Sequence, residues 1–471
     1  MHNYAFAQRS CGAQQVRASI IAKHPEAAQK FEEQRASLQG IADNYKLHIK
    51  TGVAEKTTAT SPIPVIFHIV VNSAQFTQLG GTAGISRRCD SQIAVLNRDY
   101  NRQNSDSVLI PSLWKPLYAS AGIHFGLAHT DPTGHATPGY EVKITSTSFV
   151  EGPNSYSDAK HAGTSGLDSW DETKYLNVWC INFSDNTGLL GVTVPKSYGT
   201  SLSEVGICIN YGVLGKRSSP SDYYIQSGTS LNYYDLGRTL THEIGHFFEI
   251  WHTWGDDNGL CPFYVKASCP YHGTPTAGSG SDDGLNDTPP EGDSKYDVPV
   301  YTGILGGTFH DCCATDTFGT SYQPIGVASL DFMNYTDDKA MQLFTPDQAA
   351  VMATQVSIVG VVTGENYSLT QNPGLLNWPA NTGIEQTTIK NGLNIFPNPS
   401  TGTLYITFNQ ATDELKQISI FNIIGQEVQN INIAEQQKEY YSIDLSGMSK
   451  GIYFVRCNFA SGSITRKILL Q

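Results

Sequence analysis

Runs of apolar residues with different periods divide the chain into predicted strands and helices. The nearly continuous apolar and β-branched run at residues 63–71 (IPVIFHIVV) predicts a buried strand. Apolar residues at Ile93, Leu96 and Tyr100 follow helical spacing and predict an amphipathic helix that ends near residues 104–106. Shorter apolar runs predict further strands at residues 123–128, 175–181, 191–195 and 206–209.

A second amphipathic helix is predicted to begin near Asp235, because aspartate often caps the first turn of a helix. Its buried side is expected to carry Leu236, Leu240, Ile244 and Phe247. A loop region rich in glycine and aspartate follows this helix. The order of strands, helix and loops predicts an α+β unit over residues 59–370.

The segments on either side of this unit have different compositions. Residues 1–58 are polar and helix-prone and run into an exposed junction, which is typical of a removable leader. Residues 371–390 mix Pro, Gly, Asn and Thr without periodicity and predict a linker. Short β-rich runs then alternate with turns, so residues 391–471 are predicted to form a small all-β sandwich.

Charge and hydropathy exclude several classes of protein. The net charge of −13 over 471 residues argues against nucleic-acid binding and against a basic membrane-surface protein. No apolar stretch reaches the length that spans a bilayer, so no transmembrane segment is expected.

Four of the nine cysteines lie in the loop-rich region: Cys261, Cys269, Cys312 and Cys313. They do not form two CxxC pairs, which argues against a zinc site built from these cysteines. Two disulfides formed in an oxidising compartment are the better interpretation. A bridge between the neighbours Cys312 and Cys313 would be strained, so each is expected to bond elsewhere. The pairing stays open.

The strongest chemical signal is the run HEIGHFFEIWH at residues 242–252. On a helix, His242 and His246 project from one face and can share a metal ion, with Glu243 beside them. His252 joins them only if the chain turns after Phe248, because a continuing helix would carry it to another side. A helix with incidental surface histidines is the alternative.

Three histidines leave a fourth position on zinc for a water molecule, and Glu243 is placed to accept its proton. Glu243 would then pass the proton to the leaving amine of a cleaved peptide bond. A purely structural zinc site would close with four protein ligands and would not need Glu243. The pattern therefore favours hydrolysis.

The wider pattern resembles the metzincin metalloproteases, and within them the pappalysin family. The carriers of the resemblance are the spacing HExxHxxExxH, the run HTWGD that begins at His252, the run 287–289 (DTP), and a methionine-containing turn at 331–335 (DFMNY). The resemblance implies a mixed twisted sheet with an active-site helix. It also implies that Met333 forms the floor below the metal and that Tyr335 stabilises the oxyanion.

The chain departs from the clan in two places. Glu249 stands where glycine is usual, and a non-glycine residue in a left-handed turn costs roughly 1–2 kcal/mol. Bacterial relatives usually have a cysteine just after the methionine turn, where residues 339–341 read KAM.

Other segments carry alternatives that the sequence leaves open. Cys11, in the run RSCG, resembles the cysteine motif of leaders that keep such enzymes latent; an unpaired surface cysteine is the alternative. Residues 188–195 are either the edge strand that pairs with an extended substrate or a buried core strand. Asp287 and Thr288, in an acidic loop, are candidates for a calcium site, and a solvated turn is the alternative. Asp337 or Asp338 is the candidate acid of a specificity pocket.

The tail resembles the type A sorting domain of the type IX secretion system. The matching pieces lie at residues 396–402, 422–425, 451–455 and 467–470. The resemblance implies that secretion machinery is a partner and that the chain passes through the periplasm to the cell surface or medium.

These patterns together predict a secreted zinc metalloendopeptidase that cuts proteins or peptides and is made as a latent precursor. The rival hypothesis, motivated by Glu249, is a cell-surface binding protein with a degenerate protease fold.

Overall fold

The structure, a computed structural model, divides into two compact units, Met1–Pro379 and Ala380–Gln471. It describes residues 10–51, 61–112, 114–150, 156–183, 188–198, 201–226, 233–256, 260–261, 264–265, 276–277, 283–289, 291–292, 294, 300–301, 304–305, 313–314, 328–359, 362–377, 392–409, 415–423, 426–433, 440–459 and 462–471.

A seven-stranded mixed sheet lies at the centre of the first unit, with the order β1-β6-β7-β5-β2-β3 and with β4 also paired to β2. Its strands are β1 (Ser10–Cys11), β2 (Ile63–Val71), β3 (Phe125–Leu127), β4 (Tyr140–Ile144), β5 (Leu176–Ile181), β6 (Leu189–Val194) and β7 (Gly206–Asn210). All nine residues of β2 are buried, as its continuous apolar run predicts. Strand β6 runs antiparallel to β7, whereas β2, β3, β4, β5 and β7 are parallel.

Helices α4 (Gly81–Asp99) and α5 (Arg238–Phe247) pack against this sheet, and α3 (Ser73–Gln78) packs against α4. Helix α6 (Pro346–Gln355) belongs to the same unit. Helix α5 begins at Arg238 rather than near Asp235, and its N-cap is Gly237 with a φ of 79°. Asp235 instead forms an ion pair with Arg217, so it does not cap the helix. Glycine suits the left-handed backbone that leads into α5.

Helix α5 is fixed at its first turn by acidic residues from other segments. The Arg238 guanidinium is paired with the buried Asp99 of α4 and with Asp106. Asp338 Oδ2 accepts a hydrogen bond from the Leu236 backbone N–H at 2.8 Å. Asp338 thus lies at the start of α5, and its expected role in a specificity pocket stays a prediction.

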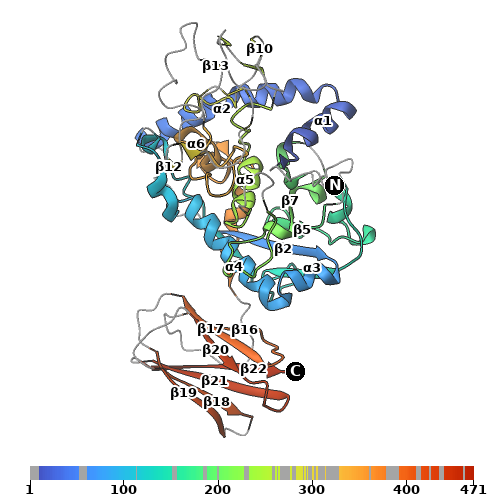
Figure 1. Ribbon diagram of the computed structural model, residues 1–471, viewed down its shortest axis with the longest axis vertical. Coiled ribbons are helices and arrows are strands. Elements are labelled where there is room, and N and C mark those ends of the chain that lie inside the picture. The colour runs from blue at the N-terminus through green and yellow to red at the C-terminus, as the bar shows by residue number, and fades with distance from the viewer. Residues whose placement is uncertain are drawn as a thin grey trace. The chain divides into compact units, whose positions relative to one another are not determined.

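The leader is part of the first unit. Helices α1 (Ala13–Lys23) and α2 (Ala27–Thr51) follow β1, and α2 runs beside α6 (Figure 1). Val16, Phe31 and Leu38 of these helices belong to the main hydrophobic core. The expected junction after the leader falls largely on residues 52–60, outside the described residues, so the predicted boundaries stay a prediction.

The second unit is an all-β sandwich, as predicted. One sheet has the order β16-β17-β20 and the other β19-β18-β21-β22. The strands are β16 (Gly392–Phe396), β17 (Thr403–Asn409), β18 (Leu415–Asn422), β19 (Glu427–Asn432), β20 (Tyr440–Asp444), β21 (Gly451–Phe459) and β22 (Gly462–Leu470). Apolar side chains of both sheets, including Ile406 and Val455, share one core.

Short two-residue strands complete the first unit: β8 (Leu260–Cys261), β9 (Tyr264–Val265), β10 (Thr276–Ala277), β11 (Val300–Tyr301), β12 (Ile304–Leu305), β13 (Cys313–Ala314), β14 (Ile358–Val359) and β15 (Val362–Thr363). The predicted disulfide cysteines Cys269 and Cys312 lie outside the described residues, as do the side chains of Cys261 and Cys313. Among the described residues, no helix combines the length and apolar character needed to cross a membrane.

Candidate metal centre

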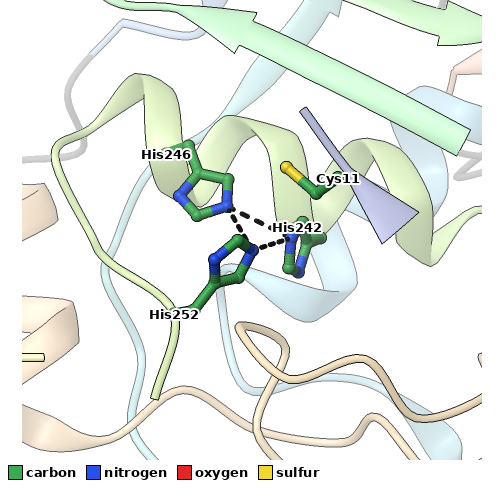
Figure 2. Close-up of side chains that lie close together, drawn as sticks. All are labelled: Cys11, His242, His246 and His252. Carbon is green, nitrogen blue, oxygen red and sulfur yellow. Dashed lines mark hydrogen bonds between the residues drawn. The ribbon is translucent and has the colours of Figure 1, made fainter. Parts of the chain in front are cut away.

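Three histidine rings meet at one point beside α5. His242 and His246 project from the same face of the helix, and His252 reaches them from the segment that follows it (Figure 2). The Nε2 atom of His242 lies 3.2 Å from that of His246 and 3.2 Å from that of His252. His246 and His252 are 3.0 Å apart at the same atoms. The structure therefore brings all three predicted metal ligands together.

The predicted turn after Phe248 is what brings His252 to the cluster. Glu249 has a left-handed backbone with a φ of 73°, at the position where the clan usually has glycine. The Ile250 N–H donates to the Gly245 carbonyl oxygen at 3.0 Å, which closes the end of the helix. Glu249 carries the strained conformation without abolishing the turn.

Each histidine is oriented by an acceptor at its other ring nitrogen. Nδ1 of His242 lies 2.7 Å from the Phe332 carbonyl oxygen, and Nδ1 of His246 lies 2.7 Å from the Ile250 carbonyl oxygen. A carbonyl oxygen only accepts, so both Nδ1 atoms carry the proton and both Nε2 atoms present lone pairs. These contacts fix the tautomer that a metal ligand requires.

The acceptor for His252 is Asp256, whose Oδ1 lies 2.5 Å from Nδ1. Burial alone would raise the pKa of Asp256, but His252 and Arg17 hold it well below its usual range, so the carboxylate is ionised. Burial also lowers the pKa of His246 and His252, which keeps the rings neutral. Three lone pairs that converge this closely repel one another unless a cation lies between them, so the donor set fits a metal ion.

Cys11 of the leader completes the cluster as a fourth potential ligand. Its sulfur and one nitrogen of each histidine all lie within 4.8 Å of one another (Figure 2). Burial, followed by the charge of Glu243, raises the pKa of the Cys11 thiol in the absence of metal. A cation at the histidines opposes that shift, because it favours the thiolate.

Glu243 lies beside the cluster, on the side of β6. The Cys11 thiol approaches its Oε2 atom at 3.5 Å, and the Thr193 hydroxyl lies 2.7 Å from the same oxygen. Gly191 of β6 packs against the carboxyl, and a Cβ atom there would lie only 2.4 Å from Oε1. The strand therefore leaves just enough room for this side chain.

Met333 and Tyr335 both lie next to the histidines. The Met333 side chain is fully buried under α5, where a Cβ added to Gly245 would meet its sulfur at 2.3 Å. The Tyr335 ring centroid is 4.8 Å from that of His252. Its hydroxyl accepts from the Cys11 N–H at 3.0 Å and donates to the Cys11 carbonyl oxygen at 3.2 Å. Their predicted positions thus agree with the structure, while their roles stay predictions.

The leader covers the edge of the sheet next to this cluster. Strand β1 pairs in parallel with β6, with Cys11 opposite Gly191. The other neighbour of β6 is β7, so β6 is the outermost strand of the catalytic sheet apart from the leader. From the sequence, residues 188–195 could form either a substrate-binding edge strand or a buried core strand. In the structure all residues of β6 are buried, but its partner on one side is the leader strand β1.

Leader side chains also hold the segment that carries His252. Arg17 is buried and forms an ion pair with Asp256, with its guanidinium carbon 4.0 Å from the centre of a Trp251 ring. Gln34 donates a hydrogen bond to Glu249. Sequence reasoning assigned no role to Asp256, although its place four residues after His252 was a usable signal.

The acidic loop lies against α6 rather than beside the histidines. The Asp347 N–H donates to Asp287 Oδ2 at 2.7 Å, and the Thr288 hydroxyl donates to the Asp283 carboxylate at 2.8 Å. Burial raises the pKa of Asp287 to about 6. Both calcium candidates thus have protein partners, and calcium binding stays a prediction.

Comparisons with known proteins agree with this geometry. A family profile described as pregnancy-associated plasma protein-A matches residues 164–357, and a secretion system C-terminal sorting domain matches residues 394–471. An extracellular metalloprotease of Pyricularia oryzae is 25% identical over 238 residues, which cover 50% of this chain and 62% of that protein. The chain therefore spans less than two thirds of that relative.

Solved structures give longer matches. Mature mirolysin of Tannerella forsythia in complex with a cleaved peptide is 30% identical, with a TM-score of 0.52 over 68% of this chain and 98% of that one. A promirolysin mutant of the same organism is 28% identical, with a TM-score of 0.57 over 78% of this chain and 98% of that one.

Proposed function

Because the chain belongs to the pappalysin family of metalloproteases, we propose that it is an exported zinc endopeptidase made as a latent precursor. The sorting domain at residues 394–471 directs it to the cell surface or medium. Secretion machinery is then its partner during export. Proteins or peptides are its substrates, and an extended substrate pairs with β6 at the edge that β1 occupies in the precursor.

The observation that carries this proposal is the convergence of three Nε2 lone pairs beside Glu243. Ligands about 2.0–2.1 Å from a tetrahedral zinc ion lie roughly 3.3 Å apart, close to the separations of 3.0–3.2 Å between these nitrogens. Imidazole nitrogens suit zinc, and three protein ligands leave a position open for reaction.

A zinc ion held by His242, His246 and His252 would supply Lewis acidity toward the scissile carbonyl and the attacking water. Glu243 accepts the water's proton and returns it to the leaving amine. Tyr335 donates to the developing oxyanion, since burial raises the pKa of Tyr335 well above its usual range and keeps the phenol protonated. Its hydroxyl already holds a peptide carbonyl in the precursor, that of Cys11.

Latency follows from the same contacts. The Cys11 sulfur lies beside the three histidines, where it would take the place of water on a bound metal ion. The Cys11 backbone bonds to the Tyr335 hydroxyl and pairs with β6. Activity is expected after the leader has been cut away. The rival, a degenerate binding protein, was motivated by Glu249; because His252 reaches the cluster despite Glu249, no observation favours it.

The test compares Glu243→Ala with Glu172→Ala, a surface control, after limited proteolysis has removed the leader. We expect Glu243→Ala to lower the hydrolysis of casein or a quenched fluorescent peptide by roughly 10²–10⁴-fold. Zinc content, measured by mass spectrometry, should stay the same as in the unchanged chain. Hydrolysis that survives Glu243→Ala, or that resists zinc chelation, would contradict the proposal.

A further inference from the structure

Thr193 contacts the general base from the strand that lies beside it. It is buried on β6, and its Oγ1 atom lies 2.7 Å from Glu243 Oε2 and 2.9 Å from the Glu243 backbone carbonyl oxygen. Gly191, two residues earlier, faces the same carboxyl group, because side chains alternate along a strand. One face of β6 therefore shapes the space around Glu243.

We propose that Thr193 is a positioning residue for Glu243 that holds its carboxylate in one orientation while Gly191 leaves room for it. This inference rests on the proposed function, in which Glu243 transfers protons. Glutamate has three rotatable side-chain bonds, and fixing them costs up to about 2 kcal/mol of rotamer freedom. A hydrogen bond that is already in place meets that cost before the substrate binds.

A hydroxyl group carries one proton, so Thr193 donates to only one of its two acceptors at a time. An ionised carboxylate is a stronger acceptor than a carbonyl, and it takes the proton while Glu243 is charged. After Glu243 has accepted a proton, its own O–H can donate to Thr193, whose hydroxyl proton then turns to the Glu243 carbonyl oxygen. Glu243 thus keeps a partner on both sides of the transfer.

The contact does not depend on the leader. In the precursor, the Cys11 thiol shares Oε2 with Thr193, and it leaves when the leader is removed. Thr193 and Glu243 both belong to the part of the chain that remains. Thr193 is therefore a contact that can still orient Glu243 in the active form.

The test uses Thr193→Val, which keeps the shape but loses the hydroxyl, and Thr193→Ser, which restores the hydroxyl. Thr239→Val is the matched control: Thr239 is also buried, in the first turn of α5, and its hydroxyl has no hydrogen-bond partner in the described part of the chain. For the processed enzyme, we expect Thr193→Val to lower kcat roughly 10- to 100-fold with KM and zinc content unchanged. Thr193→Ser should restore kcat to within about threefold of the unchanged enzyme.

A crystal structure of each processed variant gives a readout that does not need activity. In Thr193→Val the Glu243 carboxylate should occupy a second rotamer, whereas it should keep one rotamer in Thr193→Ser and Thr239→Val. A Val variant with unchanged kcat, or with Glu243 still in a single orientation, would overturn the inference, as would equal losses in Val and Ser. If the enzyme without substitutions hydrolyses no peptide, the proposed function is wrong. The number of Glu243 rotamers in the crystal structures then still tests whether Thr193 positions Glu243.

Discussion

Glu249 occupies the left-handed turn between the second and third histidines. Substitutions at this position can separate the effect of backbone strain on the free energy of unfolding from the effect of the buried carboxyl. Its φ is 73°, and its side chain is buried, at 6% exposure. Gln34 of the leader donates to one carboxylate oxygen. The other oxygen, Oε1, has no hydrogen-bond partner among the described residues.

Alanine and glycine at this position differ only in the backbone cost. Alanine keeps the left-handed strain of about 1–2 kcal/mol, which glycine relieves. Glycine also lowers the free energy of unfolding by about 0.5–1 kcal/mol, because it increases the conformational entropy of the unfolded chain. We therefore expect Glu249→Gly to be more stable than Glu249→Ala by about 0.5–1 kcal/mol, with tighter metal binding to match.

The charge of Glu249 adds a pH dependence. Burial raises the pKa of Glu249 to about 8, compared with an ordinary value of 4.5. Between these values the folded chain keeps a proton that the unfolded chain has lost, so the free energy of unfolding falls as the pH rises. The slope is at most about 1.4 kcal/mol per pH unit. Glu249→Gln cannot ionise and should lack this contribution.

The assay is urea unfolding of the metal-loaded precursor, followed by tryptophan fluorescence at about pH 5.5 and about pH 7.5. Over that interval the unchanged chain should lose up to about 2–3 kcal/mol more than Glu249→Gln. Histidine titration acts on both chains and cancels in the difference. The same loss in both chains would refute the role of the buried carboxyl, and an alanine variant as stable as the glycine variant would refute the strain argument.

Three further changes test the rest of the site. Asp256→Asn should weaken zinc binding roughly 10- to 100-fold in a chelator competition, because the third histidine loses its charged acceptor; unchanged affinity would contradict this. Cys11→Ser should leave the unprocessed chain largely latent, because Arg17 still pairs with Asp256. Adding Arg17→Gln should raise the peptide hydrolysis of this chain by a further factor of about 10 or more. Full activity from Cys11→Ser alone would show that the ion pair has no part in latency. Gly245→Ala should lower the free energy of unfolding by about 1–3 kcal/mol in urea, because the new Cβ meets Met333 at 2.3 Å; a neutral effect would mean that Met333 moves freely.

The sequence predicted the elements whose evidence is local. The apolar run of β2 and the four-residue spacing of His242 and His246 each follow from one short stretch of chain. The start of α5 was misplaced because its N-cap is Gly237, and the carboxylate that accepts from the Arg238 N–H belongs to Asp338, 100 residues away in sequence. Thr193 was equally invisible, since its contact with Glu243 depends on how β6 packs against α5.

The leader shows why a motif alone understates a contact. The run RSCG pointed to one thiol, but the folded leader also adds a strand to β6 and pairs with both ends of the segment between Glu249 and Asp256. Pairing of this kind leaves no periodic signal, because Arg17 and Gln34 lie on polar helices whose exposed and buried polar residues look alike in sequence.

These two leader contacts also suggest that the buried Glu249 carboxyl destabilises the precursor in particular. Gln34 and Arg17 leave with the leader, so Glu249 loses its amide donor and Asp256 keeps His252 but loses its arginine. If water reaches the Glu249 carboxyl once the leader is removed, part of the desolvation that raises its pKa to about 8 will be relieved. We therefore expect a rise in pH to destabilise the latent form more than the processed form, which comparing the urea unfolding of the two forms of the unchanged chain at about pH 5.5 and about pH 7.5 would check.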